Sequence, residues 1–144
     1  MASIDRVSGA LLVDTSAWIE LFRRPPHAGV APLAGEFDRV VTCLPVIQEV
    51  LQGFGEESLF RAARTAMYTL PCVESPLSAS VIDDAVDLYR RARRAGITVR
   101  SSVDCLIAAC AVRHQLTVVH CDRDFAALAT IAPLKHHEIR RVRR

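Results

Sequence analysis

The fold is decided by a short stretch near the N-terminus, ALLVDTS at residues 10–16. Its apolar residues run without interruption into Asp14, a pattern typical of a strand that is buried on both faces of a parallel sheet. Thr15 and Ser16 then open a helical spacing of apolar residues that stops before the Pro-Pro pair at 25–26. The stretch therefore predicts a strand, an acidic side chain at its carboxyl end, and a helix that follows at once.

Strands and helices are predicted to alternate along the rest of the chain. We expect strands at 39–43, 70–73, 116–121 and 137–142, and helices at 46–52, 56–69, 78–95, from 102 onward, and at 126–129. This alternation favours an α/β sandwich around a mainly parallel sheet. Residues 1–9 mix charge and polarity and are interpreted as an N-terminal lead-in, which leaves residues 10–144 as a single domain.

Composition excludes several classes of protein. A chain of 144 residues, of which 51% are hydrophobic, can bury a core without disulfides or metal staples. No apolar run approaches the ~20 residues that span a bilayer, and the N-terminus lacks the pattern of a signal peptide. The five cysteines include no CxxC pair, so we interpret them as reduced thiols. We therefore expect a soluble, cytoplasmic protein that does not associate with membranes.

The net charge of +2 hides a strong preference for arginine, since Lys135 is the only lysine. Arginines cluster at two places, namely Arg90, Arg91, Arg93, Arg94 and Arg100, and then Arg140, Arg141, Arg143 and Arg144. Guanidinium groups suit the bidentate binding of phosphate. A solvated helix face with a charged tail explains the same clusters, so both interpretations stay open at this point.

Four acidic residues stand at positions where a site could form: Asp14, Glu49, Asp104 and Asp122. Asp14 and Asp122 each follow a predicted strand, and parallel strands place their carboxyl ends at one edge of a sheet. Asp104 begins an almost wholly apolar helix, where a buried carboxylate needs a partner. Each acid also has a purely structural explanation, as a helix cap, a turn residue or part of an exposed helical turn.

Taken together, the acids favour a metal site. Carboxylates that meet in one cleft repel one another unless a cation compensates them, and Mg²⁺ or Mn²⁺ prefers such oxygen ligands. An ion held in this way can activate water for attack on a phosphoryl group. With arginines available to bind phosphates, hydrolysis of a nucleic acid becomes the favoured chemistry.

The segments that carry these acids resemble the PIN-domain family, and most closely the VapC toxins of bacterial VapBC toxin–antitoxin modules. The matching segments are, in order, residues 11–18, 45–53, 100–109 and 118–125. The resemblance implies a three-layer α/β/α PIN-like fold and a Mg²⁺-dependent endoribonuclease, with Mn²⁺ as a substitute. It also implies a cognate VapB-like antitoxin and a homodimer.

Carried over residue by residue, the resemblance assigns the family's four acidic positions to Asp14, Glu49, Asp104 and Asp122 as catalytic residues. It places the metal on Asp14, Asp104, Asp122 and the additional Asp124. The substrate is expected to be a loop of a structured RNA, either tRNA or rRNA, because unstacked loops are accessible to a shallow cleft. We expect the first arginine cluster, Arg90 to Arg100, to bind this RNA, and the antitoxin to use a groove between residues 21–22 and 50–51.

Two alternatives are weighed against this interpretation. A phosphohydrolase of the haloacid-dehalogenase type also begins with a strand that ends in Asp, but it needs a second Asp where Ser16 stands and a lysine near the site. A non-catalytic RNA-binding or interaction module would be expected to have lost an acid, and none of the four is missing.

Overall fold

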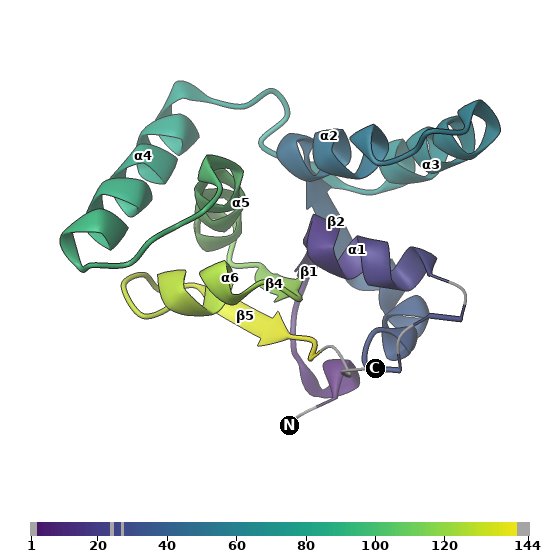
Figure 1. Ribbon diagram of the computed structural model, residues 1–144, viewed down its shortest axis with the longest axis horizontal. Helices are drawn as coiled ribbons and strands as arrows, with labels where there is room; N and C mark the ends of the chain where they lie inside the picture. The colour runs from purple at the N-terminus through teal and green to yellow at the C-terminus, as the bar shows by residue number, and fades with distance from the viewer. Residues whose placement is uncertain (1–2, 24, 27, 141–144) are drawn as a thin grey trace.

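The computed structural model describes residues 3–23, 25–26 and 28–140 and is built on a five-stranded sheet, in the order β3-β2-β1-β4-β5 (Figure 1). The strands are β1 (Leu11–Val13), β2 (Val40–Cys43), β3 (Cys72–Val73), β4 (Thr117–His120) and β5 (Lys135–Glu138). Each pair of neighbouring strands is parallel. The predicted parallel sheet is thus confirmed.

Strand β1 lies at the centre of the sheet and fixes its register. Leu11 pairs with Val40 on one side and with Thr117 on the other. Every residue of β1 is fully buried, as the uninterrupted apolar run predicts. The ends of β1 and β4 therefore lie side by side.

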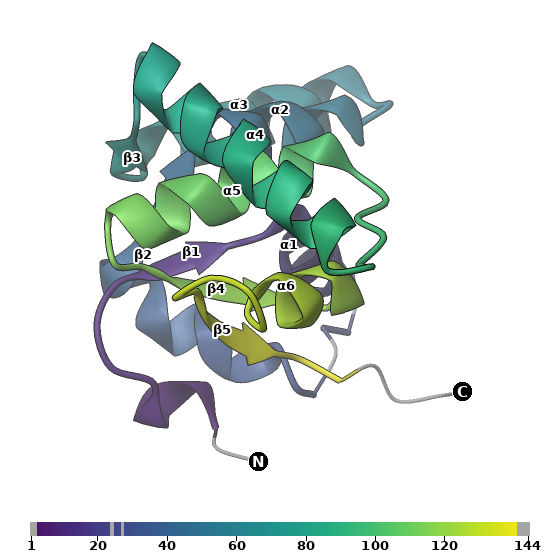
Figure 2. The same ribbon diagram turned by 90° about the vertical axis from the view of Figure 1, so that its left-hand side faces the viewer.

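Helices cover both faces of the sheet and give the predicted three layers. The helices are α1 (Thr15–Phe22), α2 (Leu44–Gln52), α3 (Glu57–Thr69), α4 (Ala79–Arg94), α5 (Ser102–Arg113) and α6 (Arg123–Leu128), with the 3-10 segments η1 (Ile4–Arg6) and η2 (Ala31–Arg39). Helices α4 and α5 lie on one face, whereas α1 and η2 lie on the other (Figures 1 and 2). Among the described residues, none of these helices has the length and hydrophobicity needed to cross a bilayer.

Helix α5 has no polar face because it is covered on two sides. It lies between the sheet and α4, and Figure 2 shows α4 passing over it. Its residues from Ile107 to Ala111 are buried in the core. The apolar sequence that follows Asp104 is therefore explained by packing, and this packing holds the start of α5 rigidly against the sheet.

The bounds of two elements differ from the prediction, because α6, expected at 126–129, spans Arg123–Leu128, and β5 begins two residues early. The described part of the N-terminal lead-in packs on the domain, because Ile4 is buried and the Arg39 guanidinium donates hydrogen bonds to the carbonyls of Ile4, Val7 and Gly9. Strand β5 was predicted at 137–142 but begins at Lys135, and residues 141–142 lie outside the described part. An edge strand is half exposed, so its sequence lacks the apolar run that marks β1.

Candidate active site

The carboxyl ends of β1 and β4 bring two of the predicted acids together. Asp14 directly follows β1, and its backbone N–H continues the ladder by donating to the Val119 carbonyl at 2.9 Å. Asp122 lies two residues beyond the end of β4. Both acids therefore stand at one edge of the sheet, as their positions after the strands predict.

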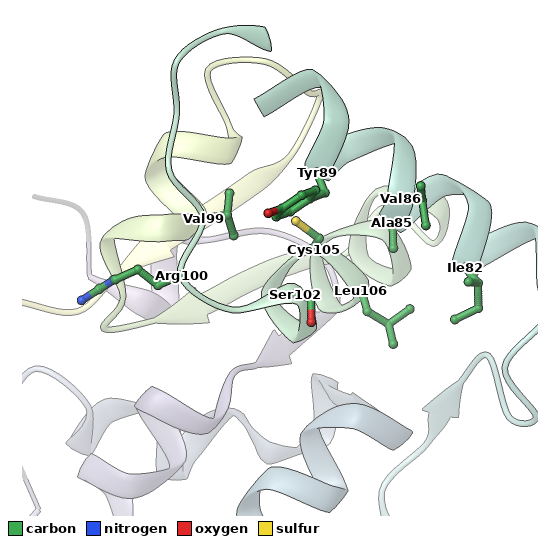
Figure 3. Close-up of a pocket in the computed structure, with 9 residues that line it drawn as sticks. All are labelled: Ile82, Ala85, Val86, Tyr89, Val99, Arg100, Ser102, Cys105 and Leu106. Carbon is green, nitrogen blue, oxygen red and sulfur yellow. The ribbon is translucent and has the colours of Figure 1, made fainter. Parts of the chain in front are cut away.

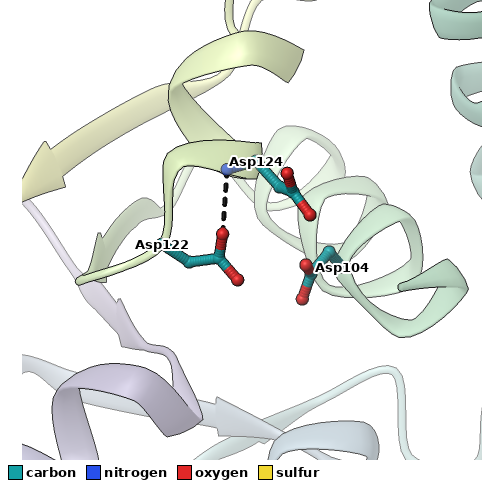
Figure 4. A group of neighbouring side chains, drawn as sticks. All are labelled: Asp104, Asp122 and Asp124. Carbon is teal, nitrogen blue, oxygen red and sulfur yellow. Dashed lines mark hydrogen bonds between the residues drawn. The ribbon is translucent and has the colours of Figure 1, made fainter. Parts of the chain in front are cut away.

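Two further aspartates face Asp122 from the helices around it. Asp104 comes from the first turn of α5, and Asp124 from the first turn of α6. A carboxylate oxygen of each of these three residues lies within 4.8 Å of the others (Figure 4). Asp104 and Asp124 are buried, at 6% and 4% exposure, so this is an enclosed group of acids.

Asp14 and Glu49 complete the acidic cluster from α1 and α2. Asp14 is 3% exposed, and its Oδ2 accepts hydrogen bonds from the Ser16 backbone N–H at 3.0 Å and the Ser16 hydroxyl at 2.6 Å. Within the described residues, Asp14 Oδ1 is buried and receives no hydrogen bond. Glu49 is half-buried, and its Oε1 accepts a hydrogen bond from the Thr15 hydroxyl at 3.2 Å.

Two of the clustered acids also cap helices. Asp14 caps α1 through Ser16, and Asp122 caps α6 by accepting from the Asp124 backbone N–H at 2.9 Å. Capping does not account for Asp104, because Ser101 holds the N-cap position of α5. The buried Asp104 carboxylate thus requires another explanation.

Burial and mutual repulsion disfavour the ionised forms of these acids. Burial, followed by repulsion from Asp14, Asp122, Asp124 and Glu49, raises the pKa of Asp104 from 3.8 to about 8. The pKa values of Asp14 and Glu49 are also raised, in each case mainly by burial. The site therefore carries more negative potential than its own groups can compensate, which favours a bound cation.

The donor set fits a hard divalent ion. Every candidate ligand is a carboxylate oxygen, and Mg²⁺ and Mn²⁺ prefer such ligands over nitrogen or sulfur. A cation at this position would satisfy the buried Asp14 Oδ1, which receives no hydrogen bond within the described residues, and would favour the ionised form of Asp104, whose pKa is otherwise raised. Asp104, Asp122 and Asp124 are the residues best placed to hold the ion, with Asp14 beside them.

The predicted arginines separate into two groups. Arg100 reaches the cluster, where its guanidinium lies 3.5 Å from Asp122 Oδ1 and 3.8 Å from Asp124 Oδ2. Arg91 instead pairs with Asp87 at 3.5 Å, and Arg93 lies over the Tyr89 ring at 5.9 Å.

The remaining predicted arginines, Arg90 and Arg94, are exposed near the end of α4. Arg123, which was not singled out from the sequence, joins Arg100 in lining a polar pocket with Ser16, Cys121, Asp122 and Glu138. Its position directly after Asp122 is the signal that would have identified it.

Two apolar grooves flank the acidic cluster. One lies between α1 and α2 beside Glu49, and it is lined in part by Trp18, Ile19, Phe22 and Phe54. The other has a volume of about 410 Å³ and lies between α4 and α5 (Figure 3). Figure 3 shows Ile82, Val86 and Tyr89 on the α4 side of this second groove, and the site residue Arg100 near its end.

His120 lies near the site but was not among the residues singled out from the sequence. It is in fact fully buried at the end of β4, and burial, followed by the neighbouring His136, lowers its pKa to about 4. A histidine within a strand that is otherwise apolar is the signal that could have drawn attention to it.

The sequence is similar to one known domain family and to proteins that are named as ribonucleases. The PIN domain family profile matches residues 11–131. The chain is 38% identical over 135 residues to Ribonuclease VapC11 of Mycobacterium tuberculosis, covering 87% of this chain and 96% of that protein. The VapC ribonuclease Mb1587 of Mycobacterium bovis matches to the same extent.

Solved structures share the fold. A DNA-bound VapBC from Salmonella typhimurium superposes with a TM-score of 0.72 at 15% identity, over 91% of this chain and 98% of that one. VapC20 of Mycobacterium tuberculosis, a toxin that cleaves the sarcin-ricin loop, gives a TM-score of 0.57 at 21% identity, over 82% and 94%.

Proposed function

Because the chain belongs to the PIN-domain family, we propose that it is a metal-dependent endoribonuclease and the toxin of a toxin–antitoxin pair. The observation that carries this proposal is the cluster of Asp104, Asp122 and Asp124, whose oxygens lie within 4.8 Å of one another. Relatives with 38% identity across nearly their whole length are named as VapC ribonucleases.

In this proposal Asp104, Asp122 and Asp124 hold a Mg²⁺ ion, or Mn²⁺ in its place, with Asp14 as a further ligand. When bound, the ion would lower the pKa of a coordinated water and stabilise negative charge on the phosphoryl oxygens. Thr15 fixes Oε1 of Glu49. The second oxygen of Glu49 is then the one that can orient a water or take up a proton.

The RNA path we propose follows the polar pocket. Arg100 and Arg123 line it on the side of Asp122, so they can bind phosphates next to the bond that is cut. Arg90, Arg91, Arg93 and Arg94, at the end of α4, would bind more distant phosphates. A structured RNA with an exposed loop, in tRNA or rRNA, suits this shallow site, and the similar VapC20 is described as cleaving such a loop.

The antitoxin is proposed to occupy the groove between α1 and α2. Ile19 and Phe22 are 49% and 44% exposed there, which leaves an apolar surface for an amphipathic helix. The groove reaches Glu49, so a bound segment could place a cationic side chain near the acids. The similar structures include several VapBC complexes.

A homodimer is proposed to form through α4. Val86 is 52% exposed, and it continues an apolar stripe with Ile82 and Tyr89. Two copies that cross antiparallel at Val86 would each bury this apolar stripe, which is the self-complementarity that a two-fold interface needs. The arginines in the last turns of α4 lie beyond this contact, where they can still reach RNA.

We place the protein in the cytoplasm, where its five free cysteines would stay reduced. Activity of the haloacid-dehalogenase type is not part of the proposal. That chemistry needs a second aspartate, and Ser16 stands in its place here. The Ser16 hydroxyl donates to Asp14 and accepts from the Cys121 backbone N–H at 2.9 Å.

The experiment that tests the function is induced expression of this chain with and without the antitoxin encoded beside it, followed by mapping of RNA 5′ ends. New ends at one or a few sites, absent when the antitoxin is present, are expected. The Asp104→Asn variant serves as the control and should produce no new ends. Ends that are unchanged by expression of the active chain would contradict the proposal.

A further inference from the structure

His120 lies where its side chain can hold the backbone of the turn that carries Asp122. It is the last residue of β4, it is fully buried, and its ring packs against Phe125 with 5.1 Å between the centroids. Its own carbonyl accepts a hydrogen bond from the Ile139 backbone N–H at 2.7 Å. Both the ring and the backbone of His120 are therefore held in place.

The hydrogen bonds of the ring have a defined direction. The Asp122 backbone N–H lies 3.2 Å from His120 Nδ1, and a backbone N–H can only donate. Nδ1 must therefore be the unprotonated nitrogen, which puts the proton of the neutral ring on Nε2. Nε2 in turn lies 2.9 Å from Nδ1 of His136 on β5, so His120 donates and His136 accepts.

This chain of hydrogen bonds fixes the connection between β4 and α6. The Cys121 N–H is bound by the Ser16 hydroxyl, and the next N–H, that of Asp122, is bound by His120. The N–H groups of Cys121 and Asp122 are thus satisfied by one side chain from the start of α1 and one from the end of β4. These two contacts hold the backbone from which the Asp122 carboxylate extends, while the carboxylate itself accepts from the Asp124 N–H at 2.9 Å.

We propose that His120 is a positioning residue of the metal site, acting as a neutral imidazole whose Nδ1 holds the Asp122 backbone and whose Nε2–H is anchored on His136. The inference rests on the proposed function, since it concerns the ion that Asp122 would help to hold. Residues that orient a metal ligand in this way affect ion affinity although they never touch the ion.

Three substitutions separate positioning from simple filling of space. In His120→Asn the side-chain oxygen falls close to the position of Nδ1 and can still accept from the Asp122 N–H. In His120→Gln the amide reaches toward the position of Nε2 instead, and in His120→Leu no acceptor remains. His137→Asn, on the same edge strand as His136, is the matched control.

The measurements are Mn²⁺ affinity by calorimetry, and kcat and KM for RNA at saturating Mn²⁺. Mn²⁺ affinity should fall about 10–100-fold in His120→Gln and His120→Leu, but less than about threefold in His120→Asn and His137→Asn. At saturating Mn²⁺, kcat should fall in the first two variants with little change in KM. Equal losses in the Asn and Gln variants, or no loss in either, would overturn the inference even if the Leu variant failed to fold.

Nitrogen NMR of the wild-type ring gives an independent readout. We expect the His120 signals of a neutral imidazole with its proton on Nε2, and a proton on Nδ1 would overturn the inference. A wild-type protein that bound Mn²⁺ but cut no RNA would overturn the proposed ribonuclease, while the variant affinities would still decide the role of His120. A wild-type protein that bound no Mn²⁺ would overturn both.

Discussion

Replacement of Asp104 by asparagine is expected to stabilise the metal-free protein while it removes activity. Asp104 is buried, and burial together with the neighbouring acids raises its pKa from 3.8 to about 8. Asparagine has nearly the shape of the protonated acid, but it cannot ionise and it offers an amide donor to the surrounding carboxylates. The variant thus keeps the packing of α5 and loses a ligand.

The size of the effect follows from the pKa difference between the unfolded and the folded chain. Unfolded Asp104 ionises near pH 3.8, whereas the folded protein keeps the proton until about pH 8. Between these values the folded state binds more protons, so wild-type stability falls as pH rises, by about 1.4 kcal/mol per pH unit. The full penalty at pH 7 is about 4 kcal/mol, and with partial relief from solvent and Arg100 we expect the variant to gain about 1–4 kcal/mol.

The assay is urea unfolding in EDTA at pH 4, 5.5, 7 and 8. The gain in the free energy of unfolding should be near zero at pH 4 and grow with pH, reaching about 1–4 kcal/mol at pH 7. Asp83→Asn, at an exposed position on α4, is the control and should change stability little at any pH. An Asp104→Asn protein that is less stable than wild type at pH 7, or equally stabilised at pH 4 and pH 7, would refute the reasoning.

Three further predictions concern the surfaces around the site. The double variant Arg100→Gln with Arg123→Gln should flatten the log–log dependence of RNA affinity on salt by roughly 1.4–1.8, because each lost phosphate contact removes about 0.7–0.9 from the slope. Filter binding measures this slope, and an unchanged slope would place the RNA elsewhere. Ile19→Asp should weaken antitoxin binding by at least about tenfold in calorimetry without loss of ribonuclease activity, since it puts a charge into an apolar groove; full neutralisation by the antitoxin would exclude that groove. Val86→Asp should convert the proposed dimer to a monomer in analytical ultracentrifugation, whereas Leu59→Asp, similarly exposed on α3, should not. A Val86→Asp protein that still dimerises would exclude α4 as the interface.

The central part of the fold could be predicted from the sequence because burial leaves a local signature. The run that ends in Asp14 marks β1, and the run before Asp122 marks β4, since a strand covered on both faces is apolar throughout. The edge strand β5 was displaced by two residues, because His136 and His137 carry no such signature. The contact between Arg39 and the N-terminal carbonyls joins segments about 30 residues apart, so no local pattern predicts it.

The acidic positions were predictable, but their supporting contacts were not. That Asp14 and Asp122 meet follows from the geometry of parallel strands. The hydrogen bond from Thr15 to Glu49 and the orientation of His120 depend on how α2 and β5 pack, which the sequence does not encode locally. The arginine cluster looked continuous in sequence, yet within the described residues Arg100 is its one member that pairs with the acidic cluster. Arg91 instead pairs with Asp87 and donates to the Ile131 carbonyl, a contact that no local pattern predicts.

The most direct test of the central claim is a cleavage assay with purified protein on a folded tRNA and rRNA stem-loop mixture, in buffered Mg²⁺ and in EDTA. Discrete cuts are expected in Mg²⁺. They should vanish in EDTA, return when Mn²⁺ is added, and be absent from the Asp104→Asn protein under every condition. Cleavage that persists in EDTA, or that Asp104→Asn performs as well as wild type, would contradict the claim that this acidic cluster is a metal-dependent ribonuclease site.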